Sequence, residues 1–599
     1  MDMDKHLKEI QEYSQAAPKL GNQYTSDTAL KTYLSAYMPE SVLQYIKPDL
    51  IQFGEKVAGE YLEMAHLAED EKPYLVKHDA YGRRIDEVRT CEGWKFFKPE
   101  AAKEGLISIP YESELKQYSR LYQMVKLYLF APSSGLFSCP LAMTDGAAFT
   151  IRELQKITDI KDYSHLGEAY KHLTSRDPSE FWTSGQWMTE KKGGSDVSNG
   201  TTTLAEKNPS GDYSLYGYKW FTSATDADMT LTLARGIKDG NPIPGKKGLS
   251  LYFSKIRDDQ GHLNNLEVIR LKDKLGTRQL PTGEILLKGT IAEKIGKEGE
   301  GVRFISNMLN ITRMHNSISA VSNMRRIIAL ARDYSHKRET FGKKIEDHDL
   351  HYRTLAWMEM TFRGNLIFLI DMASMLGRID VGKESTNDKV LFRLLTPVIK
   401  LFTAKDAMKL TSEGLECFGG LGYMENSHLP SIFRDSQVLP IWEGTTNILS
   451  LDLLRAIIKW PKSLDVLYDH LSSLLSLFDI KNIDQPSLKE AVEKLSARLD
   501  SWYKSTINIV RNKQYMEFFA RTLAFNISLL YICHKLLMMY HITKGDKEFE
   551  TLLFWVNRLE KEYEAPKEPR MYECYSAREK MMGLDKPTSD NKEDLTAKI

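Results

Sequence analysis

The sequence lacks an excess of charge of either sign, and it has few cysteines. Its 599 residues include 81 Lys and Arg against 81 Asp and Glu. A formal net charge of zero does not favour nucleic acid or an anionic membrane as the partner of the whole surface. The cysteines show no Cys-x-x-Cys spacing, which argues for a reducing compartment and against a zinc site. They are Cys91, Cys139, Cys417, Cys533 and Cys574.

Targeting and membrane-spanning patterns are missing as well. The first ten residues, MDMDKHLKEI, have neither the apolar core of a signal peptide nor the Arg-rich bias of a presequence. The most apolar late stretch, residues 527–542, is interrupted by His534 and Lys535 and is too short to span a bilayer. We therefore expect an intracellular soluble protein without a membrane span, cytoplasmic in the first instance, with mitochondria and peroxisomes left open.

Nucleotide-binding fingerprints are absent too. No Gly-x-Gly-x-x-Gly follows a predicted strand, and the phosphate-binding pattern Gly-x-x-x-x-Gly-Lys-[Ser/Thr] does not occur. Any nucleotide cofactor must therefore be held by another fold.

Hydrophobic periodicity divides the chain into regions, as its length leads us to expect. Residues 1–183 show helical spacing, with turn signals at 78–82 and 131–135, and predict an N-terminal helical domain. We assign three aromatic residues to its core, Trp94, Phe96 and Phe97. Residues 184–298 change to a period of two and predict a middle β domain. Its strand-like runs are 213–221, 229–234, 248–253 and 284–287.

Helical spacing returns from residue 299. Residues 299–456 predict a four-helix-bundle domain. One stripe of a long amphipathic helix is formed by Ile311, Met314, Ile318, Val321, Met324 and Ile328. Two further long helices are predicted at 348–376 and 389–417. Residues 457–599 predict an extra helical domain that ends in a polar tail from Gly583. The predicted fold class is mainly α with a middle β domain.

Three short stretches carry candidate chemistry. In Met188–Val197 the two glycines and the hydroxyls of Thr189 and Ser195 suit an anion, although such a stretch alone is more often a surface loop. In Lys219–Ala224 the ring of Phe221 and the hydroxyl of Ser223 share one face of a strand, which suits a planar heterocycle or ordinary core packing.

The third stretch, Trp442–Ile448, sets Glu443 beside Gly444 and a run of hydrogen-bonding residues. We interpret Glu443 as a catalytic base. Alone, the pattern is more often a helix start whose carboxylate favours the helix dipole.

Five stretches in fixed order resemble the acyl-CoA dehydrogenase family over about residues 60–455. They are TEKKGGSDV, KWFTS, RETFGK, ECFGGLGY and WEGTTNI. Arg313 and Arg338 stand 25 residues apart, as the corresponding arginines do in medium-chain members, and the Gly-Gly-x-Gly at 419–422 precedes Glu443 at the expected distance.

The resemblance implies a helical domain, a β-barrel-like domain and a helical bundle, with FAD between the last two. The residues implied to contact FAD are Met188, Thr189, Gly194, Ser195, Phe221, Ser223, Gly419, Gly420, Thr445 and Asn447. Arg338 and Phe341 are implied to reach the FAD of a neighbouring subunit, so we expect a homo-oligomer, a dimer of dimers.

By the same resemblance, the protein desaturates a fatty acyl-CoA between its α- and β-carbons. Glu443 is implied to remove the α-proton while a hydride leaves to flavin N5. Other branches carry the base at the position of Thr312, which cannot act as one. The implied substrate contacts are Ser195, Arg313, Glu443 and Gly444. We expect a medium- to long-chain substrate and electron-transferring flavoprotein as the acceptor.

Asn310 and Asp349 depart from the medium-chain pattern, which bears on the contacts to CoA and on those to FAD at the subunit interface. The stretches His78–Arg89 and Arg270–Arg278, with the extra C-terminal domain, resemble the AidB-type branch more closely.

The branch opens alternatives. The first is a DNA-associated flavoprotein like AidB, but residues 461–599 contain 21 basic and 21 acidic residues, so we do not expect nucleic acid to bind there. The second is a flavoprotein that holds a fatty acyl ligand as a lipid sensor or sink with slow turnover. The third is an acyl-CoA oxidase, against which the end Thr596–Ile599 weighs because it is a poor peroxisomal address.

Overall fold

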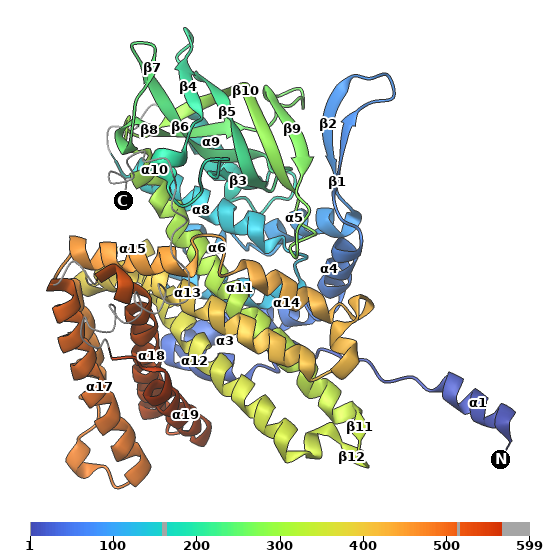
Figure 1. Cartoon of the computed structure of the whole chain (residues 1–599), viewed down its shortest axis with the longest axis vertical. Helices are drawn as coiled ribbons and strands as arrows, with labels where there is room; N and C mark the ends of the chain where they lie inside the picture. The colour runs from blue at the N-terminus through green and yellow to red at the C-terminus, as the bar shows by residue number, and fades with distance from the viewer. Residues whose placement is uncertain (1, 158–163, 512–515, 566–599) are drawn as a thin grey trace, which may run out of the picture.

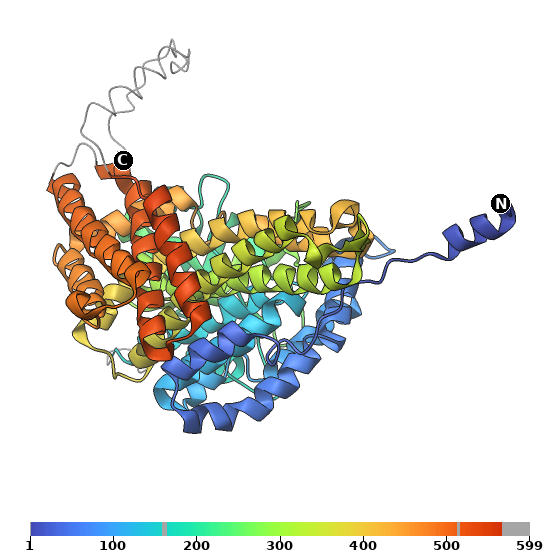
Figure 2. The same cartoon turned by 90° about the horizontal axis from the view of Figure 1, so that it is seen from below.

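The computed structural model describes residues 2–157, 164–511 and 516–565. Most strands gather at one end of the molecule and helices fill the rest, so the predicted fold class, mainly α with a middle β domain, is confirmed (Figure 1). The last helices of the chain stand on the side of the bundle away from the N-terminus (Figure 2). Cys574 and the polar tail expected from Gly583 lie outside the described residues.

Helices dominate the first part of the chain. Helix α2 begins at Thr28 because the carboxylate of Asp27 accepts a hydrogen bond from the backbone N–H of Leu30. As predicted, Trp94 and Phe97 are buried, and Phe96 is half-buried against the same core. The helices are α1 (Met3–Glu12), α2 (Thr28–Tyr37), α3 (Glu40–Lys56), α4 (Glu60–Asp70), α5 (Glu92–Lys103), α6 (Ile109–Glu112), α7 (Ser119–Phe130), α8 (Ser138–Gln155) and α9 (Ser164–Leu173).

The turn expected between helices at 78–82 joins two strands instead, β1 (Tyr74–His78) and β2 (Arg84–Arg89). A two-stranded hairpin alone is marginally stable in water, so it needs tertiary contacts. The carboxylate of Asp86 accepts a hydrogen bond of 2.9 Å from the backbone N–H of Val268 in the β domain. Arg84 pairs with Glu267 of the same strand. These distant partners explain why local helical spacing gave the wrong element.

The middle strands close into a barrel. Five strands form a ring in the order β6-β4-β5-β10-β8, which closes because β8 also pairs with β6. Alternate residues of these strands fill the interior, among them Leu231, Leu233 and Leu251. The strands are β3 (Ser184–Trp187), β4 (Leu204–Lys207), β5 (Tyr213–Ser223), β6 (Met229–Lys238), β7 (Asn241–Pro242), β8 (Leu249–Lys255), β9 (Leu266–Leu271) and β10 (Thr282–Ile295).

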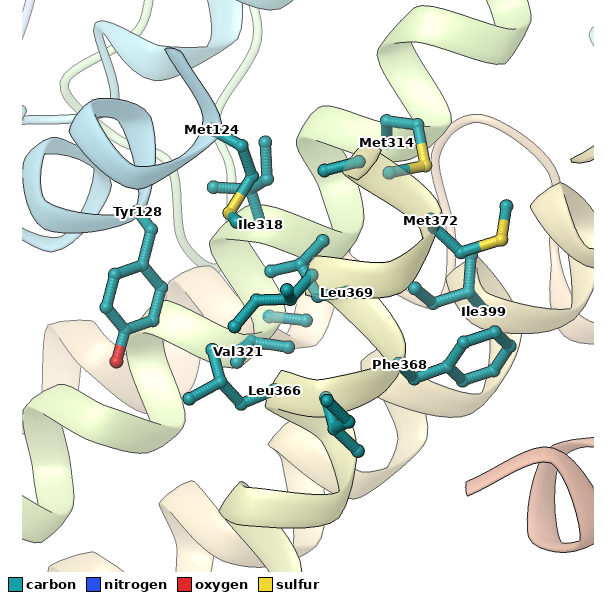
Figure 3. Packing of buried hydrophobic residues seen from close by; sticks show 14 of the residues in the cluster. Met124, Tyr128, Met314, Ile318, Val321, Leu366, Phe368, Leu369, Met372 and Ile399 are labelled. Carbon is teal, nitrogen blue, oxygen red and sulfur yellow. The ribbon is translucent and has the colours of Figure 1, made fainter. Parts of the chain in front are cut away.

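A bundle follows, built on the 37-residue helix α11. Its start packs against β8 because Gly301 has no side chain, and a Cβ there would lie 2.6 Å from the carbonyl carbon of Ser250. All six residues of the predicted apolar stripe are buried. Three of them, Met314, Ile318 and Val321, lie among side chains of α7, α12 and α13 (Figure 3). The helices are α11 (Gly301–Lys337), α12 (Asp349–Asp380), α13 (Thr386–Glu416), α14 (Leu429–Val438) and α15 (Thr446–Lys459).

Four more helices follow. They are α16 (Ser463–Leu475), α17 (Pro486–Arg511), α18 (Met516–Thr543) and α19 (Asp546–Glu562). Of these, α16, α18 and α19 pack against α12, α13 or α15, and α17 packs against the other three. Helix α18 is longer than the apolar stretch 527–542, which was predicted from the sequence to be too short to span a bilayer. By length and composition, this helix could cross a membrane. In the fold, 83% of its most apolar window is buried inside the protein, as expected of a core helix.

Candidate functional site

A cavity of about 1220 Å³ lies where the first helices, the barrel and the bundle meet. Its wall includes residues of α4, α8, β5, α11 and α14, and of the loop after α14. This volume exceeds the usual range of roughly 300–1,000 Å³ for a small-molecule site. The cavity can therefore hold a large ligand or two ligands side by side.

Glu443 lines this cavity from the loop between α14 and α15. Its φ of +57° lies in the left-handed region, and Gly444 follows at +104°. Thr312 on α11 donates a hydrogen bond of 2.6 Å from Oγ1 to Oε2 of Glu443. The carboxylate therefore faces helix α11 in the cavity wall. The alternative interpretation, a carboxylate that favours the dipole at the start of its own helix, does not describe this contact.

The surroundings of Glu443 have opposing effects on the pKa of its carboxyl group. Burial raises the pKa of its carboxyl group, and the hydrogen bond from Thr312 and the charges of Arg313 and Lys400 lower it, leaving a net rise. A carboxyl group with a raised pKa is a stronger base once it is ionised. Proton acceptance is therefore a chemistry that this position supports.

Lys400 is a member of the site that the sequence analysis missed. It is fully buried on α13 and donates a hydrogen bond of 2.6 Å from Nζ to the carbonyl oxygen of Gly444. Burial lowers its pKa to about 7 against the opposing charge of Glu443. A lysine inside the apolar run Leu394–Phe402 was the signal that could have revealed it, because a lone buried lysine needs a reason.

Arg313 is held by an ion-pair network beside the same loop. Its Nη1 donates to Asp452 at 2.8 Å and its Nε to the carbonyl oxygen of Glu443 at 3.3 Å. Arg393 of α13 also binds the carboxylate of Asp452. The network fixes the main chain at Glu443, so Arg313 acts on the loop that carries the carboxylate as well as lining the cavity.

The loop after β3 brings Met188, Thr189, Gly194 and Ser195 to the cavity wall. Within this loop Glu190 is buried and forms an ion pair of 2.8 Å with Lys219 of β5. The hydroxyl groups of Thr202 and Thr203 also donate to the carboxylate of Glu190. These bonds anchor the glycine-rich loop to the barrel.

Phe221 and Ser223 line the cavity from β5, as their alternation predicts. The Phe221 ring is 50% exposed, so it is not part of a closed core. Ser223 shares a hydrogen bond of 3.2 Å with Thr282.

Gly444 and Thr445 also line the cavity, so ten of the predicted site residues meet there. The other five lie away from it: Arg338, Phe341, Gly419, Gly420 and Asn447. Phe341 is 97% exposed in the short β11–β12 hairpin (Glu339–Thr340 and Lys343–Lys344). Arg338 contacts Tyr13 and Gln15 of its own N-terminal segment.

Three segments of the chain match known protein families. Residues 15–167 match the family model for the adaptive response protein AidB N-terminal domain. Residues 185–290 and 299–458 match the models for the acyl-CoA dehydrogenase middle and C-terminal domains.

Individual relatives extend the likeness. The chain is 46% identical over 522 residues to acyl-CoA dehydrogenase family member 11 of Caenorhabditis elegans, covering 87% of this chain and 84% of the relative. It is 32% identical to AidB of Escherichia coli, covering 70% of this chain and 75% of that one. The crystal structure of Caenorhabditis elegans ACDH-11 in complex with C11-CoA superposes with a TM-score of 0.91 and 42% identity, covering 96% of this chain and 98% of that one.

Proposed function

The chain belongs to the acyl-CoA dehydrogenase family, in its AidB-type branch, and we propose that it desaturates a medium- to long-chain fatty acyl-CoA with Glu443 as the base. The proposal rests above all on the Glu443 carboxylate, which lines the large cavity with a raised pKa and a hydroxyl donor 2.6 Å away.

Glu443 accepts the α-proton of the thioester. Thr312 orients the carboxylate through its hydroxyl group, and Lys400 and Arg313 hold the main chain of the loop by bonds to the carbonyl oxygens of Gly444 and Glu443. Because Glu443 is a non-glycine residue with positive φ, these bonds keep a strained main chain in place. The base is then pre-positioned at low cost in entropy.

FAD is the cofactor of this family. The cavity suits it because the side-chain oxygens of Gln186 and Gln279 are buried in its wall with no hydrogen-bond partner among the described residues. Gly194 leaves room beside Thr189, where an added Cβ would lie 3.3 Å from the Thr189 hydroxyl. Bound there, FAD supplies the electron sink for the hydride that leaves the β-carbon. Met188, Thr189, Ser195, Phe221, Ser223 and Thr445 are the residues proposed to hold it.

Arg338 and Phe341 are proposed to complete the FAD site of a neighbouring subunit. The exposure of the Phe341 ring at the tip of a hairpin supports this assignment, because a large apolar side chain gains by burial against a partner. Gly419, Gly420 and Asn447, which also lie outside the cavity, are assigned to the same shared site. The protein would then act as a homo-oligomer, a dimer of dimers, and pass its electrons to electron-transferring flavoprotein.

The proposed length of the acyl chain is based on the length of the cavity. Its wall follows α11 from Leu309 to Leu330, a rise of about 30 Å at ~1.5 Å per residue. The Caenorhabditis elegans relative of known structure was crystallised with C11-CoA, which supports an acyl chain of medium length or longer here. The same depth also favours a second candidate, a lipid-holding flavoprotein with slow turnover.

Anaerobic mixing of the purified flavoprotein with saturated acyl-CoAs of increasing length separates the two. Rapid loss of the visible flavin absorbance at a medium or long chain length is expected for the dehydrogenase. Tight binding without loss of absorbance at any length would contradict the dehydrogenase and identify a ligand-holding protein. Measuring affinity by calorimetry on the same samples keeps binding and turnover apart.

A further inference from the structure

One arginine in the cavity wall has no ionic partner in the part of the chain that the structure describes. Arg326 on α11 is 3% exposed and lines the cavity. Its guanidinium group donates to the carbonyl oxygen of Pro132 at 3.2 Å and to the Ser133 hydroxyl at 2.6 Å. Its Nε–H has no acceptor, and the group forms no ion pair within the described residues. The neighbouring Arg325, by contrast, pairs with Asp27.

A buried cation without a counter-charge is costly, so its retention calls for an explanation. Burial lowers the pKa of Arg326 to about 10, which still leaves it charged at neutral pH. His66 supplies no negative charge to balance Arg326. Burial and the nearby charges of His428 and Arg326 lower the pKa of His66 to about 4, so its ring is neutral. The remaining donors of Arg326 include Nε–H, which is one of the two N–H groups that bind a carboxylate side-on.

Arg326 lines the cavity far along α11 from Glu443, one turn before Leu330, where the wall leaves this helix. Residues three or four apart on α11 line one continuous face: Thr312, Asn316, Ser319, Asn323 and Arg326. Thr312 contacts the Glu443 carboxylate, and Arg326 follows 14 residues later, about 21 Å along the helix axis at ~1.5 Å per residue. Because helical side chains lean toward the N-terminus, the guanidinium group reaches back toward Glu443 by roughly one turn, about 5 Å.

We propose that Arg326 is a subsite for a carboxylate at the distal end of the acyl chain, so that the protein takes ω-carboxyacyl-CoAs in preference to unsubstituted ones of equal length. This assignment rests on the proposed function of the cavity. A separation of roughly 16–21 Å corresponds to on the order of 13–17 single bonds at ~1.2 Å each in an extended chain. The matching substrate therefore has about 14 to 18 carbons.

The test compares tetradecanoyl-CoA with the mono-CoA thioester of tetradecanedioic acid. The ratio of their apparent second-order rate constants for anaerobic flavin reduction is measured for the wild-type protein, Arg326→Met and Arg332→Met. Arg332 is exposed on the same helix and does not line the cavity, so it is the matched control. The corresponding C8 pair is an internal control, because a C8 chain is too short to reach Arg326.

We expect the C14 ratio to favour the ω-carboxyl ligand in the wild type and to fall by about 10- to 100-fold in Arg326→Met, the loss typical of charge-assisted hydrogen bonds. Arg332→Met and the C8 ratio should show no such change. An equal C14 ratio in wild type and Arg326→Met would overturn the subsite, even if both ligands reduce the flavin.

Equilibrium binding of the same C14 pair keeps the subsite separate from catalysis. If no acyl-CoA reduces the flavin, the proposed function fails, but a ratio of dissociation constants that depends on Arg326 still supports the subsite. If Arg326→Met does not fold, Arg326→Lys replaces it, since a lysine keeps the charge but loses the fork. A smaller preference in Arg326→Lys supports the subsite, and an unchanged preference overturns it, because the assignment rests on the Nε–H that lysine lacks.

Discussion

Removing the Thr312 hydroxyl should make the proposed base harder to ionise. Thr312→Val replaces the hydroxyl by a methyl group of similar volume and deletes the 2.6 Å hydrogen bond to Oε2 of Glu443. This bond lowers the pKa of Glu443 against the effect of burial. The variant leaves burial in force and removes one of the contributions that offset it.

The size of the change follows from the strength of such bonds. A hydrogen bond to a charged group contributes about 1.5–3 kcal/mol, and one pKa unit corresponds to about 1.4 kcal/mol. The pKa of Glu443 should therefore rise by roughly one to two units in Thr312→Val. Because only the ionised carboxylate accepts a proton, flavin reduction should require a correspondingly higher pH.

The assay is the rate of anaerobic flavin reduction by saturating acyl-CoA, followed from acidic to alkaline pH. Thr312→Ser is the matched control, since it keeps the hydroxyl group and should retain the wild-type profile. A Thr312→Val profile that coincides with the wild type would show that this hydroxyl does not act on the base in the reacting complex.

Three further changes test other parts of the structure. Lys400→Met should abolish a pH dependence of the folding stability. The pKa of Lys400 is lowered to about 7, below its unfolded value, so the folded state binds fewer protons than the unfolded state between these two pH values. Wild-type stability therefore rises with pH in this range, by up to about 1.4 kcal/mol per pH unit. Chemical denaturation at pH 7 and pH 9 measures this, and an equal rise in the variant would contradict it. Gly364→Ala should destabilise the fold by about 1–3 kcal/mol, because the added Cβ would lie 2.1 Å from the Trp555 ring. Gly167→Ala on α9, with open space around its Cβ, is the control in urea unfolding, and equal stabilities would argue against the packing of α19. Arg338→Ala should purify with a lower flavin-to-protein ratio, whereas full flavin occupancy would argue against a shared FAD site.

Elements with strong local signals were predictable from the sequence. The apolar stripe of α11 repeats every three or four residues over five turns, and such a run has no competing interpretation. The long strand β5 was found through its alternation, whereas only residues 284–287 of the 14-residue strand β10 were predicted. The hairpin β1–β2 was not, because its stability comes from Val268 and Glu267, far away in the sequence.

The site divides in the same way. Glu443 and the glycine-rich loop were found through short motifs whose order resembles a family. Arg326 carries no motif and Lys400 is marked only by its place in an apolar run, so their contacts appear when helices α11 and α13 are placed around one cavity. Burial and the absence of a partner are three-dimensional properties, so a single sequence does not show them.

The proposed mechanism depends on Glu443 as the base. Its most direct test is anaerobic mixing of Glu443→Gln with the acyl-CoA that reduces the wild-type flavin fastest, with ligand binding measured in parallel. The amide keeps the shape and the hydrogen bond from Thr312 but cannot accept the α-proton. We expect normal FAD content and acyl-CoA affinity with flavin reduction lost. Reduction at the wild-type rate would remove Glu443 from the mechanism.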